Sequence, residues 1–200
     1  MTYYILFGIT YALAAALQPG PLQTYIISQT LNKGWKATIA TAFAPIISDI
    51  PIFIIVFFLL TKLPPTFLNV LRIIGGLFLF YLSYRTFNSW KHYSYNNNNG
   101  NSIGTFFNAV LVNLLNPNPY IGWSLIMGPM VLEAWNKTPS FAITLVVCFY
   151  LTMIISLIGL IFLFSYARSI GPKISRSLLG LSSIGLFIFG IYQLYRGITF

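Results

Sequence analysis

Apolar residues along this chain form long runs, separated by short stretches that are basic or rich in Pro, Gly and Asn. A hydrocarbon core about 30 Å thick needs about 20 apolar residues in a helix, and six stretches of roughly that length occur. Each should be helical, because lipid offers no partner for free backbone groups. The pattern predicts an all-α, polytopic membrane protein with six transmembrane helices, at residues 3–31, 37–61, 66–90, 103–130, 139–167 and 176–196.

A polar stretch in the middle of the chain divides the predicted helices into two groups of three. It contains the consecutive asparagines Asn96–Asn99, a composition that favours a solvated loop. We expect a first three-helix repeat at residues 1–92, a polar linker at 93–102 and a second three-helix repeat at 103–200, all within one membrane domain. No basic segment precedes the first helix, so we expect it to be retained rather than cleaved as a signal peptide.

The first helix of each group is interrupted by two prolines that flank a single residue. Pro19–Pro21 follow Gln18 in the first half, and Pro117–Pro119 follow Asn116 in the second. Proline removes an amide donor and clashes with the preceding turn, so two in close succession should unwind the helix. We therefore expect helices 1 and 4 to be broken.

A second match between the halves follows in the same order. The sequence Gly-Leu-Phe-Leu-Phe at Gly76–Phe80 corresponds to Gly-Leu-Phe-Ile-Phe at Gly185–Phe189, which indicates a duplicated unit. Because each unit has an odd number of spans, the second would cross the membrane in the opposite direction. Inverted repeats with broken helices are typical of secondary transporters, whose sites lie near the bilayer midplane. Chance similarity between Gly- and Phe-rich apolar helices is the alternative.

The two breaks are candidate binding elements. Backbone freed at membrane depth has to be buried in protein or face a water-filled cavity. In such a cavity, half-helices beginning at Pro21 and Pro119 would point their positive ends at an anionic group of the substrate, such as a carboxylate. Ordinary kinks are the alternative, since proline is common in membrane helices. Paired interruptions in corresponding segments favour the binding interpretation.

An acid lies at the centre of the second predicted helix. Asp49 is flanked by Pro45 and Pro51 in an otherwise uncharged run, and an acid at this depth costs about 2.5–3.5 kcal/mol on insertion scales. It would accept a proton or pair with a substrate ammonium, and capping of freed amides is the alternative. Polar side chains near the breaks, Gln23 among them, could bind a zwitterion or satisfy the backbone. The predicted substrate-binding residues are Gln18, Pro19, Gly20, Pro21, Asp49, Asn113, Asn116, Pro117, Asn118 and Pro119.

Composition supports a membrane location. Hydrophobic residues make up 57% of the chain and charged residues 6%, against about 25% charged residues in soluble domains. A net charge of +9 would suggest nucleic acid as the partner of a soluble protein. Here the basic residues are scattered between apolar runs, so we expect lipid and a small-molecule substrate as partners, and no nucleic acid.

The distribution of basic residues predicts the orientation, because cytoplasmic loops carry an excess of Lys and Arg. One side of the predicted topology holds Lys33, Lys36, Arg85, Lys91, Arg168, Lys173 and Arg176. The other side holds Lys62, Arg72, Lys137 and Arg196. The excess on the first side predicts that both termini lie outside, in a bacterial inner (plasma) membrane. The sequence gives no basis for an oligomeric state.

Several chemistries are not expected of this sequence. It has no Gly-x-x-x-x-Gly-Lys-Ser/Thr motif for nucleotide phosphates, so transport would use an ion gradient or a partner. One histidine, His92, and one cysteine, Cys148, cannot form a recognisable metal site, and no histidine lies at membrane depth to activate a nucleophile. We expect no enzymatic activity, no cofactor and no metal.

The ordered set of motifs resembles the lysine-exporter (LysE/RhtB-type) family of six-span bacterial amino-acid exporters. The matching elements are Pro19–Pro21, Asp49, Gly75-Gly76 with Tyr81-Leu82, and Asn113–Pro117. The chain departs from the family pattern at Gln18, where Ser is common, and at Asn118, where Lys is common. Both departures fall in the expected site, so no particular amino acid is carried over as the substrate.

The resemblance implies export of amino acids or related small zwitterionic metabolites, coupled to the proton gradient. The family's wider relatives include thiol-disulfide electron carriers, and the single cysteine excludes that mechanism within this chain. A non-transporting membrane scaffold or assembly subunit is the alternative function. A passive channel is less favoured, because the sequence has no ring of like charges and no repeated filter sequence.

Overall fold

The computed structural model describes residues 1–58, 65–92 and 102–199, and these residues form helices without any strand. The all-α class is therefore confirmed. In chain order the elements are α1 (Thr2–Leu17), α2 (Pro21–Lys33), α3 (Trp35–Thr38), the 3-10 helix η1 (Ile39–Phe43), α4 (Ala44–Phe58), α5 (Pro65–Lys91), α6 (Ser102–Leu114), α7 (Pro117–Gly122), the π-helix η2 (Trp123–Met127), α8 (Gly128–Lys137), α9 (Pro139–Ile170) and α10 (Pro172–Thr199).

Four segments of the described chain are long and apolar enough to cross a membrane, namely Trp35–Val56, Asn69–Lys91, Pro139–Ile170 and Pro172–Thr199. The bent pair α1 and α2 would make a fifth span. The span predicted at residues 103–130, with an expected interruption at Pro117–Pro119, is divided into α6, α7, η2 and α8. The fragment α6 is only 13 residues long, whereas about 20 are needed to cross the hydrocarbon core.

Two other boundaries differ from the sequence predictions. The predicted helix at residues 37–61 is built from α3, η1 and α4, with the tighter 3-10 turn just before Pro45, and residues 59–61 lie outside the described residues. Most of the predicted linker, residues 93–101, also lies outside them. Ser102, placed in the linker by the sequence, is the first residue of α6.

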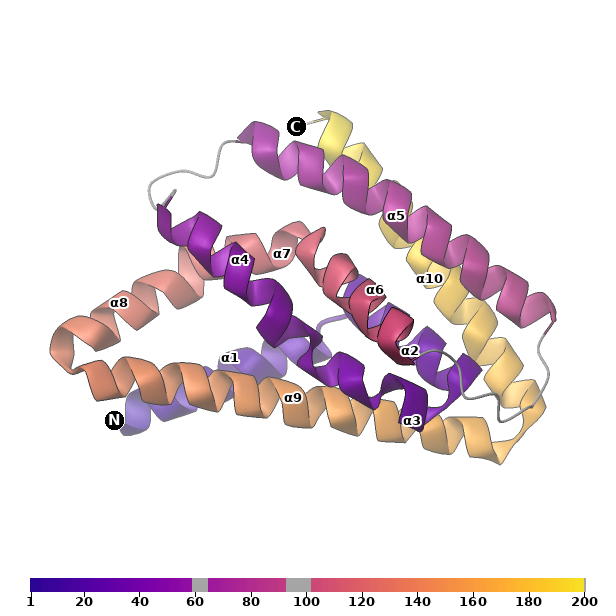
Figure 1. The fold of residues 1–200 in the computed structure, drawn as a ribbon, viewed down its shortest axis with the longest axis horizontal. Helices are drawn as coiled ribbons and strands as arrows, with labels where there is room; N and C mark the ends of the chain where they lie inside the picture. Colours follow the sequence, from indigo (N-terminus) through magenta and orange to yellow (C-terminus); the bar gives the residue numbers. More distant parts are fainter. Residues whose placement is uncertain (59–64, 93–101, 200) are drawn as a thin grey trace.

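Helices α5 and α10 form a closely packed antiparallel pair at one edge of the molecule (Figure 1). Their centres are joined by two reciprocal hydrogen bonds, from Ser83 Oγ to the Ser183 carbonyl oxygen (2.9 Å) and from Ser183 Oγ to the Ser83 carbonyl oxygen (3.1 Å). A Cβ atom on Gly76 would lie 3.0 Å from the Gly190 carbonyl oxygen. In lipid no hydrophobic effect drives helices together, so association relies on close packing, which small residues at the contact allow.

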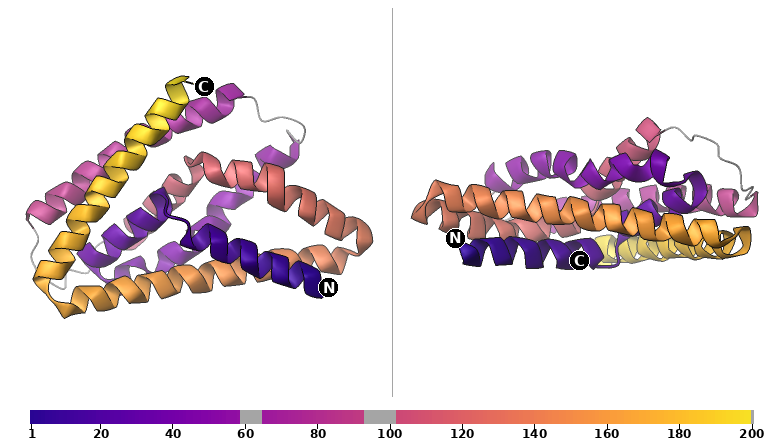
Figure 2. Two further views of the ribbon diagram at one scale, coloured as in Figure 1. Left: turned by 180° about the vertical axis from the view of Figure 1, so that it is seen from behind. Right: turned by 90° about the horizontal axis from the view of Figure 1, so that it is seen from below.

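The long helix α9 forms another edge, and α1 packs along it (Figures 1 and 2). A Cβ atom on Gly8 of α1 would lie only 2.8 Å from the Leu145 carbonyl oxygen of α9. The two parts of the first broken helix therefore pack against long helices, α1 against α9 and α2 against the α5/α10 pair.

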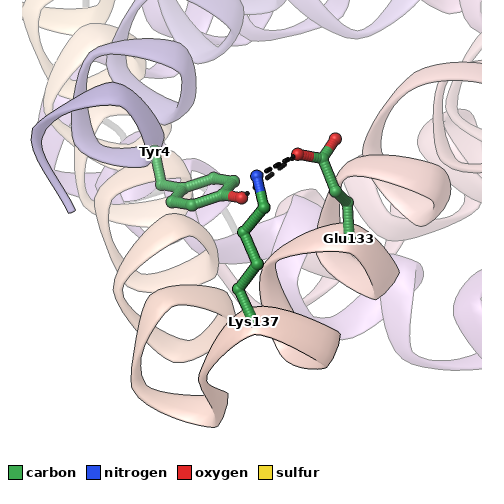
Figure 3. A network of polar contacts seen from close by, with 3 residues as sticks. All are labelled: Tyr4, Glu133 and Lys137. Carbon is green, nitrogen blue, oxygen red and sulfur yellow. Dashed lines mark hydrogen bonds and ion pairs between the residues drawn. The ribbon is translucent and has the colours of Figure 1, made fainter.

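An exposed ion pair marks the outer end of α8 (Figure 3). Lys137 Nζ lies 2.7 Å from Glu133 Oε1, and the buried Tyr4 hydroxyl donates a hydrogen bond to the same oxygen at 3.3 Å. Hydrogen bonding to Lys137 lowers the pKa of the Glu133 carboxyl from its usual value. Trp135 beside them is 53% exposed, as suits an aromatic residue at a membrane surface.

Candidate functional site

Both proline-flanked segments interrupt their helices. Helix α1 ends at Leu17 and α2 begins at Pro21, with the two helices bent by 63° (Figure 2). Gln18 and Gly20 between them have extended backbone. In the second half, α6 ends at Leu114 and α7 begins at Pro117, after the extended Asn116. The backbone therefore leaves the helical path at both positions that the sequence singled out.

The two breaks and the buried acid line one cavity of about 120 Å³. It is large enough for several water molecules, and its polar lining suits them. Eight of the ten predicted residues line this central cavity: Gln18, Pro19, Gly20, Asp49, Asn113, Asn116, Asn118 and Pro119. Pro21 and Pro117 do not line it; they are buried first residues of α2 and α7, where a missing amide hydrogen costs nothing.

Asp49, on α4, is the charged centre of the cavity. Its side chain is 5% exposed, and its Oδ2 atom accepts hydrogen bonds from Trp123 Nε1 (3.2 Å) and the Tyr150 hydroxyl (3.0 Å). Its Oδ1 atom accepts one from Asn113 Nδ2 at 3.3 Å. Among the described residues that line the cavity, no other is Asp, Glu, Lys, Arg or His. A buried carboxylate needs such donors to offset the loss of water.

Three separate elements supply these donors. Asn113 comes from the last turn of α6 and also donates to Ser48 Oγ at 2.7 Å. Trp123 is the first residue of the π-helix η2, a helix form that is frequent at functional sites. Tyr150 comes from α9. Helix α4 and the second-half helices are therefore joined through one carboxylate.

Aromatic rings form part of the cavity wall. The rings of Tyr11 and Phe149 stack with their centroids 5.7 Å apart, and Trp123 meets Phe149 edge to face at 6.5 Å. These residues, with Tyr150, are absent from the predicted set. The sequence offered no signal for them, because aromatic residues within apolar helices usually face lipid or the protein core.

Some polar residues at the breaks satisfy the freed backbone. Gln23 Nε2 donates to the carbonyl oxygens of Ala15 (3.0 Å) and Ala16 (3.3 Å), near the end of α1. Asn116 Oδ1 accepts from the backbone amide of Asn118 at 3.1 Å and so caps α7. Satisfying the freed backbone was the alternative to substrate binding that the sequence left open for these carboxamide side chains.

The two breaks differ chemically. Helix α7 begins at Pro117, two residues before the expected start. Of its first three residues only Asn118 has an amide hydrogen, and this amide already donates to Asn116 Oδ1. Helix α2 has proline only at its first position, so the amides of Leu22 and Gln23 remain in its first turn, where an α-helix offers them no partner. Both residues line the cavity. The positive helix end expected at both breaks is therefore available at α2 alone.

The comparison with family profiles identifies the protein class. The LysE type translocator profile matches residues 13–197 of the 200 residues, which includes both breaks and Asp49. The chain belongs to the LysE type translocator family. Searches of curated proteins and of solved structures found no match to it.

Membership of this family assigns a general role. The LysE type translocator is a multi-pass integral membrane protein that transports a small molecule across a lipid bilayer. The resemblance drawn from the ordered motifs is confirmed, and all residues that line the central cavity except Tyr11 lie within the matched residues.

Proposed function

We propose that this translocator is a secondary exporter of amino acids or related small zwitterionic metabolites, and that it works by transport rather than catalysis. The observation that carries the proposal is the meeting of both helix breaks with Asp49 at one polar cavity. In transporters, substrate sites typically lie where broken helices from two halves come together. The ten residues predicted from the sequence are proposed as the site or its immediate support.

The chemistry of the cavity suits a zwitterion. Asp49 would pair with a substrate ammonium group, and the rings of Tyr11, Trp123 and Phe149 provide faces that attract a cation. The first turn of α2 would receive the substrate carboxylate, because amides at a helix N-terminus favour negative charge. A cavity with one carboxylate and one positive helix end matches a molecule that carries both charges.

The same carboxylate supports coupling to protons. Ionisable residues at membrane depth are expensive and commonly serve proton relays. If Asp49 bound either a proton or the substrate ammonium, the two would compete for the same carboxylate. A proton that enters from outside could then displace the substrate there, so that inward proton movement drives export. Transport by this scheme needs neither a nucleotide nor a cofactor.

The helix arrangement supports an exchange between two access states. The antiparallel α5/α10 pair, joined by the reciprocal Ser83 and Ser183 hydrogen bonds, would be the contact between two oppositely oriented repeats. Six crossings follow if α1–α2 and α6–α8 each form one broken span. Rocking of such repeats about a fixed midplane site is the usual mechanism of this architecture.

The positions of the basic residues support a cytoplasmic assignment for one end. The segment α3, the C-terminal ends of α5 and α9 and the start of α10 lie together at one end of the molecule (Figure 1). These segments carry most of the larger basic group predicted from the sequence. By the positive-inside rule this end faces the cytoplasm, which leaves both termini outside the inner membrane.

A scaffold or assembly subunit remains the alternative function. Such a protein would use the breaks only to shape a packing surface, with a dry contact between the first helices of the two halves. The polar cavity at that contact favours transport instead.

Replacement of Asp49 tests the proposal. Asp49→Asn keeps the shape and two hydrogen-bonding atoms but removes the charge, so we expect normal expression and loss of gradient-driven efflux by about tenfold or more, as for the loss of a charged partner. Metabolite profiling of cells that lack or overproduce the protein identifies the exported compound, and its efflux is then measured.

Glu133→Gln is the matched control, because it removes the other acid of the chain from an exposed position that does not line the cavity. We expect efflux near the wild-type rate. Unchanged efflux by Asp49→Asn at equal expression would reject the proposed role of the acid.

A further inference from the structure

A second, smaller polar cavity lies between α2, α5 and α6, apart from the central one. Its volume is about 40 Å³, and it shares no lining residue with the central cavity. Two basic residues line it, Lys33 at the end of α2 and Arg85 near the end of α5. Lys33 is half-buried, and Arg85 is more exposed.

The walls of this basic cavity consist mainly of uncharged hydrogen-bonding groups. Lys33 Nζ donates to Thr105 Oγ1 at 2.8 Å, and Asn32 Nδ2 donates to Ser89 Oγ at 3.1 Å. Gln29 and Asn108 add two further carboxamides to the lining. All of these side chains can donate hydrogen bonds, and a lining of such donors suits a ligand with oxygen acceptors.

No acidic side chain of this chain can neutralise the two cations. The sequence contains two acids, Asp49 and Glu133. Asp49 is held in the central cavity by Trp123, Tyr150 and Asn113, and Glu133 is paired with Lys137. Neither lines the basic cavity, so its positive charge has no counter-ion among the acidic side chains.

We infer that the basic cavity binds an oxyanion that comes from outside the chain. An arginine guanidinium presents a planar fork that fits phosphate or carboxylate oxygens, and the lysine ammonium adds a second positive charge. Two cations brought together repel each other unless an anion lies between them. The group is a phosphate, carried by an anionic phospholipid headgroup or free in solution. This inference goes beyond the proposed export function and does not depend on it.

Thermal stability of the purified protein tests the inference in two arms. In neutral-detergent micelles, inorganic phosphate is titrated against chloride at equal ionic strength. In nanodiscs, phosphatidylcholine alone is compared with phosphatidylcholine containing phosphatidylglycerol. We expect a saturable rise of the unfolding temperature in at least one arm, because a ligand that binds only the folded state stabilises it. The arm that responds identifies the source of the phosphate.

Variants locate the effect. Lys33→Gln and Arg85→Gln should each raise the apparent dissociation constant by about tenfold or more, as expected for loss of a charge-assisted contact, and Arg85→Lys should retain part of the binding. Lys36→Gln and Lys91→Gln are matched controls, since both are exposed, lie close in sequence to the tested residues and do not line the cavity.

Two results would overturn the inference. One is the absence of a saturable shift in both arms with the wild-type protein, a measurement that does not depend on the folding of any variant. The other is an equal loss in the Lys36→Gln and Lys91→Gln controls, which would mean that diffuse surface charge attracts the anion.

Discussion

Asp49 is the acid of the proposed site and lies in the central cavity. Its two oxygens accept hydrogen bonds from residues of α6, η2 and α9. A change in its protonation or pairing would therefore alter contacts with three elements. In the proposed mechanism a substrate that pairs with this carboxylate would alter all three contacts, because loss of a hydrogen bond to a buried charge is expensive.

Tyr150 provides a test of this network that leaves the carboxylate in place. Tyr150→Phe removes the hydroxyl 3.0 Å from Asp49 Oδ2 and little else. A hydrogen bond to a charged group contributes about 1.5–3 kcal/mol, so we expect the substrate concentration for half-maximal efflux to change by about tenfold or more. Tyr166→Phe, on the exposed face of the same helix, should behave as wild type. Equal kinetics in both variants would exclude Tyr150 from the site.

The sequence identified the residues of the site that belong to a recognisable pattern. Asp49 was found because an isolated acid in an apolar run is unusual, and the carboxamides because they adjoin the prolines. Trp123 and Tyr150 were missed because their hydrogen bonds to Asp49 join residues that are 74 and 101 positions apart in the chain. Only tertiary packing reveals such contacts.

At the scale of elements, the breaks are stabilised by specific side chains. Gln23 reaches back across the first break to two carbonyl groups of α1, and Asn116 caps the helix after the second. Such contacts hold the half-helices at a fixed angle while leaving the cavity open. The breaks are therefore stabilised features of the fold, since several of their freed backbone groups have side-chain partners.

Replacement of Gln23 tests this role. Gln23→Ala leaves the Ala15 and Ala16 carbonyl groups without their side-chain donor, so we expect the free energy of unfolding in micelles to fall by about 1–3 kcal/mol. Asn136→Ala, at an exposed position on α8, should change it by less than about 0.5 kcal/mol. An equally small effect at Gln23 would show that the bond does not stabilise the break.

The extents of the uninterrupted helices were predicted more closely than the subdivisions of the interrupted ones. The predicted segment 139–167 corresponds to α9 and 66–90 to α5, because a long apolar run leaves a helix as its only solution in lipid. In the segment 103–130 the sequence predicts an interruption at the prolines, but it predicts neither the cap at Asn116 nor the π-helix that begins at Trp123. Neither produces a change in hydropathy.

At the scale of the whole molecule, long packed helices at two edges adjoin a central region of broken helices (Figure 1). The α5/α10 pair forms one edge (Figure 1), and the long helix α9 forms another and contributes Phe149 and Met153 to the central cavity. This division suits a carrier, because movement can be confined to contacts between packed units while the binding groups keep their relative positions.

The central claim is that the two breaks enclose a water-filled cavity inside the membrane, and cysteine accessibility measures this directly. The chain has a single cysteine, so Cys148→Ser gives a cysteine-free background. Two substitutions are introduced into it separately: Asn118→Cys, at a residue that lines the cavity, and Leu151→Cys, at an exposed residue of α9 that does not. In native membranes we predict that a hydrophilic, charged thiol reagent modifies Asn118→Cys and leaves Leu151→Cys unmodified. Equal inertness of the two positions would contradict the account, because it would place the breaks in a dry helix contact.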